Sequence, residues 1–296
     1  MKGMREIRSR IKAVKSTGQI THAMQLVASS KMKRAQQLAQ AGRAYNMLLL
    51  DMMDTLNEMG ASKGYDYPML KPREVKKRLV IVFSTDKGLC GPLNSNLFKE
   101  IAAMGKNCAF IAIGNKAARF LSATKRELLA HFNISDKVKF SELKSVVDFA
   151  ISEYTNGNCD TIEVLYPNFI NTLKQDTTLQ KIVPIDNFDE LLGSFKKKYK
   201  STLTLHDKDD RELLIEPSPK ELFKKLGIYY VRNTIYQVAL NAKASEQSAR
   251  MVSMKAASDN ADNLIAELSL QYNKARQESI TNEIVELSAG MTQSKK

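Results

Sequence analysis

A loop rich in glycine and polar residues holds the side chains best suited to chemistry. It reads FSTDKGLCGPLNSN over residues 83–96 and follows a continuous apolar run, LVIVF. In that position Cys90 could act as a nucleophile and Asp86 could bind a metal ion. The spacing of Gly88 and Gly91 matches neither the GxGxxG nor the GxxxxGK[ST] phosphate loop. We therefore expect a tight turn that lets the next helix pack closely, with no catalytic, cofactor-binding or metal-binding role.

The histidines and cysteines are too scattered to form a metal or acid–base site. The histidines are predicted in a long helix (His22), at a helix end (His131) and in a loop (His206). The aspartates after His206 lack the glycine and the closing glutamate of an EF-hand, so we expect a solvated turn there. Three widely spaced cysteines form neither a disulfide framework nor a metal motif, which predicts reduced, buried thiols: Cys90, Cys108 and Cys159.

A compact α/β section must position these residues. Four segments are predicted strands: residues 79–83, 108–113, 161–166 and 176–183. The first two are continuous apolar runs, which are typical of strands buried on both faces. Three amphipathic segments are predicted helices: residues 93–104, 116–124 and 141–155. Pro167 and an asparagine-rich turn are expected to separate the last two strands. The alternation of strand and helix predicts right-handed βαβ units, and hence a Rossmann-like α/β domain.

Both ends of the chain are poor in helix breakers over long stretches. Residues 220–296 contain no proline and only two glycines, Gly227 and Gly290. The 62 residues between these glycines would reach roughly 90 Å as a single helix. Apolar residues recur in steps of three and four at both ends, which is the heptad signature. We predict an N-terminal coiled-coil helix at residues 1–63, an α/β domain at 64–212 and a C-terminal coiled-coil helix at 213–296.

The heptad steps also define the expected seams. The first helix shows two apolar groups, Ile7, Ile11 and Val14, then Ile20, Met24 and Val27. The step from Val14 to Ile20 breaks the phase, which predicts a register shift near Gly18. The expected seam of the last helix is rich in small residues: Ile235, Val238, Ala242, Ser245, Ala249, Val252 and Ala256.

The charge is high and unevenly distributed. The formal net charge is +13; residues 1–46 carry ten Lys/Arg and one acidic residue, whereas residues 242–287 carry five Lys/Arg and seven Asp/Glu. Opposite signs suit two helices that pair with each other, and they leave a basic stripe for an outside partner. The stripe could bind nucleic-acid phosphates or an acidic protein surface, but no aromatic residue lies among its cations. No apolar run approaches the length of a membrane-spanning helix.

Three stretches carry a resemblance to a known family. They are IRSRIKAVKSTGQITHAMQLVASSKMKRAQ, STDKGLCGPLNSN, and ASEQSARMVSMKAASDNADNLI followed by YNKARQESITNEIVEL. They resemble, in order, the opening helix, a characteristic loop and the C-terminal end of F-type ATP synthase gamma subunits. The resemblance covers the whole chain in the order helix, α/β domain, helix. The chain departs from the family pattern at Pro92 and at residues 287–291.

The resemblance implies a non-catalytic rotor shaft without a cofactor. In this family the terminal helices form an antiparallel, left-handed coiled coil inside a ring of three alpha and three beta subunits. The α/β domain lies against the epsilon subunit and the membrane c-ring. Rotation of the shaft couples proton flow to ATP synthesis and hydrolysis. The implied location is the cytoplasmic face of the bacterial inner membrane, peripheral through the c-ring, with no nucleic-acid partner.

The motif match also implies partner contacts. Met24, Lys31 and Arg34 are expected to face the lever region of the beta subunits. Four residues of the last helix are expected to make polar contacts with the ring: Arg250, Gln277, Thr281 and Glu283. Taken alone, the residues leave two other classes open, namely a basic coiled-coil scaffold that binds nucleic acid and an α/β enzyme that uses Cys90 or Asp86.

Overall fold

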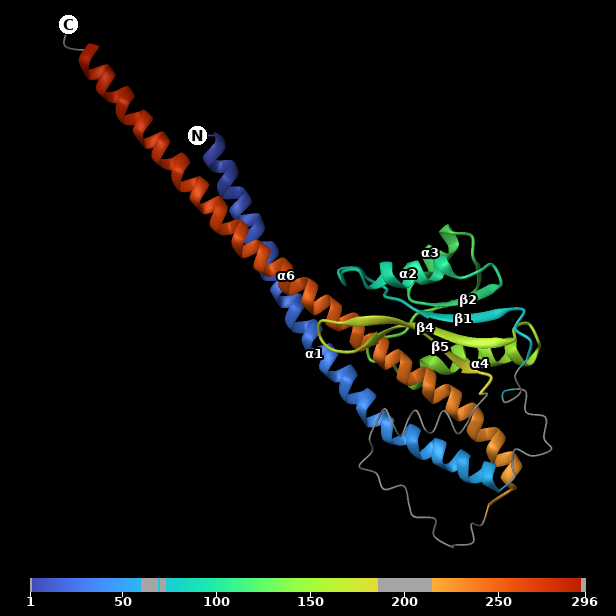
Figure 1. Cartoon of the computed structure of the whole chain (residues 1–296). Helices are drawn as coiled ribbons and strands as arrows, with labels where there is room; N and C mark the ends of the chain where they lie inside the picture. Colours follow the sequence, from blue (N-terminus) through green and yellow to red (C-terminus); the bar gives the residue numbers. More distant parts are fainter. Residues whose placement is uncertain (1, 60–68, 70–72, 186–214, 294–296) are drawn as a thin grey trace. The chain divides into compact units, whose positions relative to one another are not determined.

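The computed structural model describes residues 2–59, 69, 73–185 and 215–293 (Figure 1). Two long helices, α1 (Lys2–Glu58) and α6 (Pro219–Gln293), flank an α/β section in sequence. Its strands are β1 (Arg78–Phe83), β2 (Cys108–Ile113), β3 (Glu127–Phe132), β4 (Thr161–Phe169) and β5 (Gln175–Val183). Its helices are α2 (Leu93–Ala103), α3 (Asn115–Ala123) and α4 (Phe140–Thr155). The predicted boundaries near residues 63 and 212, and the loop around His206, lie outside the described residues.

The five strands form one mixed sheet in the order β3-β2-β1-β4-β5. β1 pairs in parallel with β2 and β4, β3 pairs in parallel with β2, and β5 runs antiparallel to β4. The parallel part has the strand order of a doubly wound fold, which confirms the predicted Rossmann-like domain.

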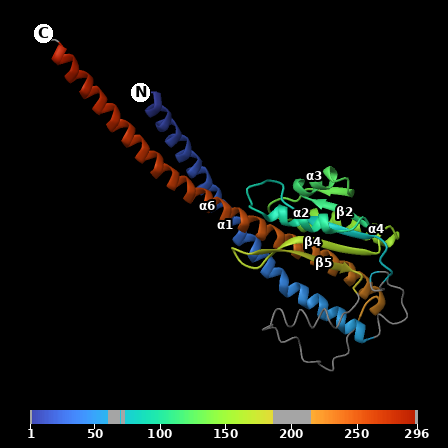
Figure 2. The same ribbon diagram turned by 45° about the horizontal axis from the view of Figure 1, so that its top comes forward.

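Both faces of the central strands β1 and β2 are covered, which explains their unbroken apolar runs. Val80 and Val82 pack with α2 and α3, whereas Leu79 and Ile81 belong to the core that contains α4, α1 and α6. Successive side chains of a strand point to opposite faces, so a strand buried on both sides has no polar alternation. Figures 1 and 2 show α2 and α3 on one face of the sheet and α4 with α6 on the other.

Two features of the sheet differ from the sequence-based prediction. Residues 127–132 form the edge strand β3, which was not predicted, and His131 lies in this strand instead of at a helix end. Its side chains alternate between half-buried and exposed, so no apolar run marks it. The second difference is that β4 continues through Pro167 to Phe169. β4 pairs with β1 only as far as Leu165, so the proline lies where the strand has a single neighbour.

The long helices pair in opposite directions within each of two compact units. The units are Met1–Ser29 with Arg250–Lys296, and Ser30–Ala249. In the first, a Cβ atom placed on Gly18 would lie 3.2 Å from that of Ala261. In the second, Gly42 adjoins the side chain of Gln237, and Asn46 bonds with Asn233. From Gly42 to Asn46 the chain moves forward along α1, while their partners Gln237 and Asn233 move back along α6. The two helices therefore run in opposite directions, which confirms the predicted antiparallel coil.

The predicted register shift near Gly18 is wrong. Every seventh residue of α1 from Met4 to Met53 is buried or half-buried, and so is every seventh residue from Ile7 to Leu56. The heptad is therefore continuous. Small or polar residues occupy its middle positions, so hydrophobicity does not reveal them: Gly18, Thr21, Gln25 and Ala28. The expected seam residues Ile20 and Val27 are instead 58% and 54% exposed.

The expected seam of α6 also needs correction. Within the second unit, Ala242 lines a cavity of the α/β domain, and Ala249 packs with Cys90 and Leu93 of that domain. The face toward α1 instead contains Asn233 and Gln237, as their contacts above establish. Farther along, Ala256 is exposed, and the buried α6 residues among those described in the first unit are Met254, Ala261 and Leu268. α6 is thus buried on two faces in the second unit. A small side chain fits either face, so the sequence pattern does not show which face meets α1 and which meets the α/β domain.

Candidate functional site

The loop after β1 is held by its own hydrogen bonds. Asn94 donates through Nδ2 to Thr85 Oγ1 at 2.8 Å and to Cys90 Sγ at 3.3 Å. Thr85 Oγ1 donates to the carbonyl of Lys87 at 2.7 Å. Leu89 and Gly91 adopt positive φ angles of 65° and 56°, which give the turn its tight path. Cys90 is 2% exposed and packs against Leu93 and Ala249, so its thiol contributes to packing.

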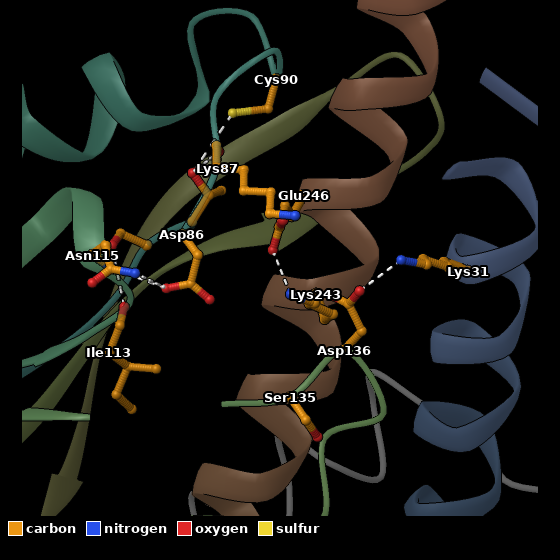
Figure 3. Close-up of polar contacts among 12 residues, drawn as sticks. Lys31, Asp86, Lys87, Cys90, Ile113, Asn115, Ser135, Asp136, Lys243 and Glu246 are labelled. Atoms are coloured by element: carbon orange, nitrogen blue, oxygen red, sulfur yellow. Dashed lines mark hydrogen bonds and ion pairs between the residues drawn. The ribbon is translucent and has the colours of Figure 1, made fainter. Parts of the chain in front are cut away.

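Asp86 caps a helix. Its Oδ1 atom accepts hydrogen bonds from the backbone N–H of Asn115 at 3.0 Å and from Asn115 Nδ2 at 3.1 Å (Figure 3). Ser84 Oγ accepts from the N–H of Ala117 at 2.9 Å. The first N–H groups of a helix form the usual anion site of doubly wound folds. In this chain, a carboxylate and a hydroxyl of the loop after β1 occupy those donors at α3.

The crevice at the carboxyl ends of β1, β2 and β4 is filled by α6. This is the place where doubly wound folds bind ligands. Ser84, Gly114 and Pro167 line it from the sheet, while Lys243 and Glu246 line it from α6. The remaining cavity is about 30 Å³, which leaves room for only a few water molecules. The arrangement anchors a helix at the position where a nucleotide would otherwise bind.

A close approach of backbones shapes the wall of this crevice. Gly114 has a φ of 96°, and a Cβ atom there would lie 2.4 Å from the carbonyl oxygen of Ser84. Only glycine can occupy this position, because both the conformation and the space exclude a side chain. The edge of β2 and the loop after β1 are thereby held together beneath α6.

The cysteines are buried thiols, as predicted. Burial raises the pKa of Cys159 to about 11, and burial also raises the pKa of Cys108. A thiol with a raised pKa is a poor nucleophile at neutral pH. In the parts of the chain that the structure describes, no three His, Cys, Asp or Glu side chains are grouped to hold a metal ion. In those same parts, no helix has the length and apolar content needed to cross a membrane.

The seam of the coil contains a buried amide pair. Asn46 and Asn233 are 4% and 7% exposed, and Asn233 Nδ2 donates to Asn46 Oδ1 across the seam. A buried Asn at a seam position fixes the register of a coiled coil, because any slip would leave the amide without its partner. This pair therefore determines which residues of α1 meet which residues of α6.

The predicted partner-contacting residues of the first unit lie mostly at its surface. Met24 and Arg250 are half-buried, and Gln277 and Thr281 are exposed. Thr281 Oγ1 donates to the carbonyl of Gln277 at 2.9 Å, so these two residues occupy one face of α6. Glu283 lies in α6, but its side chain is outside the described residues.

The two remaining predicted contacts, Lys31 and Arg34, lie in the second unit and are both exposed. Lys31 Nζ forms an ion pair with Asp136 at 2.6 Å. Asp136 also accepts a hydrogen bond from Lys243, at 2.9 Å. Sequence reasoning missed Asp136, Lys243 and the Asn46–Asn233 pair. With the seam placed correctly, the Asn at a heptad position would have indicated the amide pair. No signal in the sequence connects Asp136 with its two distant lysines.

These features define an α/β protein whose ligand crevice is occupied by its own coiled coil. A family model described as ATP synthase matches residues 3–292. An ATP synthase gamma chain of Opitutus terrae is 43% identical to this chain over 289 residues. The alignment covers 98% of each chain. A gamma chain of Methylacidiphilum infernorum is 42% identical over 293 residues, with 96% of each chain covered. The chain therefore belongs to the ATP synthase gamma chain family.

Solved structures agree on the fold. The rotor of the Euglena gracilis mitochondrial ATP synthase aligns with a TM-score of 0.63 at 16% identity, covering 94% of this chain and 99% of that one. The central stalk and c-ring structure of the Tetrahymena thermophila enzyme aligns with a TM-score of 0.58 at 24% identity, covering 81% and 99%. These alignments support the predicted combination of paired terminal helices and a central α/β domain.

Proposed function

We propose that this chain is the central rotor shaft of an F-type ATP synthase. It couples proton-driven rotation of the c-ring to the conformational cycle of the catalytic beta subunits, in ATP synthesis and in hydrolysis. The observation that carries this proposal is the match to an ATP synthase gamma chain over 98% of both chains. The chain supplies mechanical coupling and is itself non-catalytic.

The structure suits a shaft for physical reasons. α1 and α6 are continuous helices of 57 and 75 residues, and each has a seam toward the other. The buried Asn46–Asn233 pair opposes sliding of one helix along the other. Rotation presents different faces of the paired helices to each beta subunit in turn. A face that fits one conformation better than another shifts the population toward that conformation.

Large apolar side chains on the first unit support a surrounding protein partner. Several are strongly exposed there: Ile20 58%, Val27 54%, Leu270 74% and Ile284 59%. A surrounding protein would remove these side chains from water, which is favourable for apolar surface. The proposed partner at this unit is the ring of three alpha and three beta subunits.

The proposal includes the contacts and location implied by the sequence motifs. The residues proposed to contact the ring are Met24, Lys31, Arg34, Arg250, Gln277, Thr281 and Glu283. The other partners are the epsilon subunit and the c-ring, and nucleic acid is not among them. The chain is peripheral, on the cytoplasmic face of the bacterial inner membrane. Its proposed parts remain the helix at 1–63, the α/β domain at 64–212 and the helix at 213–296.

Reconstitution tests the proposal. Purified alpha and beta subunits are mixed with the chain, and ATP hydrolysis is measured for the mixture and for each component. We expect the chain to form a complex whose ATP hydrolysis depends on its presence. ATP hydrolysis by the isolated chain would favour an enzyme, and salt-sensitive binding to random DNA without assembly would favour a scaffold.

Two tryptophan variants sharpen this test. Ala249 is 8% exposed against Cys90 and Leu93, so Ala249→Trp should destabilise the isolated chain by about 1–3 kcal/mol through overpacking. Ala256 is exposed, so Ala256→Trp should leave the isolated chain as stable as the wild type and impair turnover only inside the ring. Unchanged turnover of the Ala256→Trp complex would argue against a close collar around this part of α6.

A further inference from the structure

A single carboxylate binds lysines from both long helices. Asp136 lies in the loop between β3 and α4, within the second unit. Its Oδ2 atom accepts from Lys31 Nζ of α1 at 2.6 Å, and its Oδ1 atom accepts from Lys243 Nζ of α6 at 2.9 Å. Figure 3 shows Asp136 between these two helices. Each oxygen of the carboxylate thus serves a different helix.

The ion pairs continue into the interior. Lys243 Nζ also contacts Glu246 Oε2 at 2.9 Å. The side chains of Lys243 and Glu246 are only 12% and 9% exposed, whereas those of Lys31 and Asp136 are 44% and 51% exposed. Two positive and two negative charges alternate along this cluster, so it is neutral overall. Neutrality allows the buried lysine to keep its charge, since an unpaired buried cation would be strongly unfavourable.

The protonation of these groups agrees with this geometry. The hydrogen bond from Lys31, helped by Lys243, lowers the pKa of Asp136 to about 2 despite some burial. Burial alone would lower the pKa of Lys243, but the carboxylates of Glu246 and Asp136 raise it above its usual value. Asp136 and Lys243 are therefore both charged at neutral pH.

The loop that holds Asp136 is itself fixed to α4. The backbone N–H and the hydroxyl of Ser135 both donate to Glu142 Oε2, at 2.9 and 3.0 Å. The N–H of Val138 donates to the carbonyl of Ser135 at 3.0 Å, and Val138 has a positive φ of 46°. A force on Asp136 is therefore passed to α4 through short polar contacts.

Directional contacts resist sliding in a way that apolar contacts do not. The hydrophobic contribution depends on buried area and has little preference for direction. A charge-assisted hydrogen bond weakens when the donor and acceptor are displaced, because it needs a defined distance and angle. The core between the α/β domain and the long helices can therefore hold them together, while polar contacts such as those of Asp136 favour one relative position.

We propose that Asp136 is a positioning residue for torque transfer, which ties the α/β domain to α1 through Lys31 and to α6 through Lys243. This inference rests on the proposed rotor function. Torque that enters through the α/β domain must reach both helices of the coil without slack. Loss of the carboxylate leaves Lys243 paired with Glu246, so the core stays neutral enough to fold while the domain loses one polar contact with each long helix. α6 keeps its bonds from Arg232 to Asp148 and from Asn241 to Asn168.

The test compares three variants in the complete membrane-bound complex. Asp136→Asn keeps the shape and removes the charge, and Asp136→Glu restores a carboxylate. Glu127→Gln is the matched control, since the Lys77–Glu127 pair has a similar distance of 2.7 Å and similar exposures of 40% and 48%. Glu127 belongs to β3 and Lys77 precedes β1, so this control pair does not involve the long helices. The measurements are assembly, ATP hydrolysis and proton pumping per ATP hydrolysed.

We expect Asp136→Asn to assemble normally and to lose part of the proton pumping per ATP hydrolysed. Asp136→Glu should restore most of the ratio, and Glu127→Gln should leave it unchanged. Equal ratios for Asp136→Asn and Glu127→Gln would overturn the positioning role while leaving the rotor function intact. Failure of the wild-type chain to couple pumping to hydrolysis would instead overturn the rotor function.

Discussion

The Asn46–Asn233 pair predicts an unusual pattern of stability changes. The two side chains are almost fully buried and bond to each other across the seam. Asn46→Leu leaves the Asn233 amide buried without this partner, and Asn233→Leu does the reverse. Each single variant should lower the free energy of unfolding by about 1–3 kcal/mol. The double variant replaces both polar groups by apolar ones and should lie within about 1 kcal/mol of the wild type.

Urea unfolding of the purified chain, followed by circular dichroism, measures these three changes and their coupling energy. A double variant as unstable as the sum of the two single variants would refute a direct bond between the amides. It would also refute the assignment of this pair to the interior of the seam.

An engineered disulfide between α1 and α6 tests the register of the coil, which the Asn46–Asn233 pair is expected to maintain. Gly18→Cys with Ala261→Cys should oxidise readily, because a Cβ atom at Gly18 lies 3.2 Å from that of Ala261, close to disulfide geometry. Gln19→Cys with Ala261→Cys is the control, since Gln19 is exposed. Adding Asn46→Leu and Asn233→Leu should lower the yield of the first disulfide, because slipped registers no longer leave an amide unpaired. Equal yields from positions 18 and 19 would contradict the antiparallel register.

Three other predictions test the coil, the loop and the buried titrating groups. Leu268 is 6% exposed, so Leu268→Ala should lower the free energy of unfolding by about 2–5 kcal/mol. Leu270 is 74% exposed, so Leu270→Ala should change it by less than about 0.5 kcal/mol. Similar urea midpoints for the two variants would place the seam elsewhere. Cys90→Ser should leave ATP hydrolysis by the assembled complex nearly unchanged, and a loss beyond about tenfold would indicate a chemical role. Burial raises the pKa of Cys159 to about 11 and that of Tyr230 to about 12. The two neutral side chains therefore stabilise the fold fully below their unfolded pKa values of about 8.5 and 10, and this stabilisation is lost as pH rises through the folded values. A urea midpoint that stays the same between about pH 8 and 12 would be inconsistent with both shifts.

Much of the fold was predictable from local sequence patterns. The strand at residues 108–113 was predicted with the bounds that the structure gives, because a strand buried on both faces is apolar at every position. The absence of breakers predicted both long helices. β3 was missed because an edge strand is buried on one side only, and Pro167 was taken for a breaker because its single-sided pairing depends on the neighbouring strand.

The candidate site was less predictable, because its groups come from distant parts of the chain. Motifs identified the loop with Asp86 and Cys90, but the role of Asp86 depends on the start of α3, twenty-nine residues later. The roles of Lys31 and Lys243 depend on Asp136, which no motif includes. Partners of this kind are determined by the packing of the domain and are invisible to any local pattern.

By itself, the sequence determined the type of every described element except β3, the approximate length of the two terminal helices and the family to which the chain belongs. Helix periodicity and breaker content act within a few residues, and long motifs keep their order, so all three can be read directly. Only the tertiary structure decided which face of each long helix meets which neighbour. Gly18 and Ala242 are both buried, yet one packs in the coil and the other against the α/β domain. Small side chains fit either surface, so the assignment depends on what the rest of the chain places opposite them.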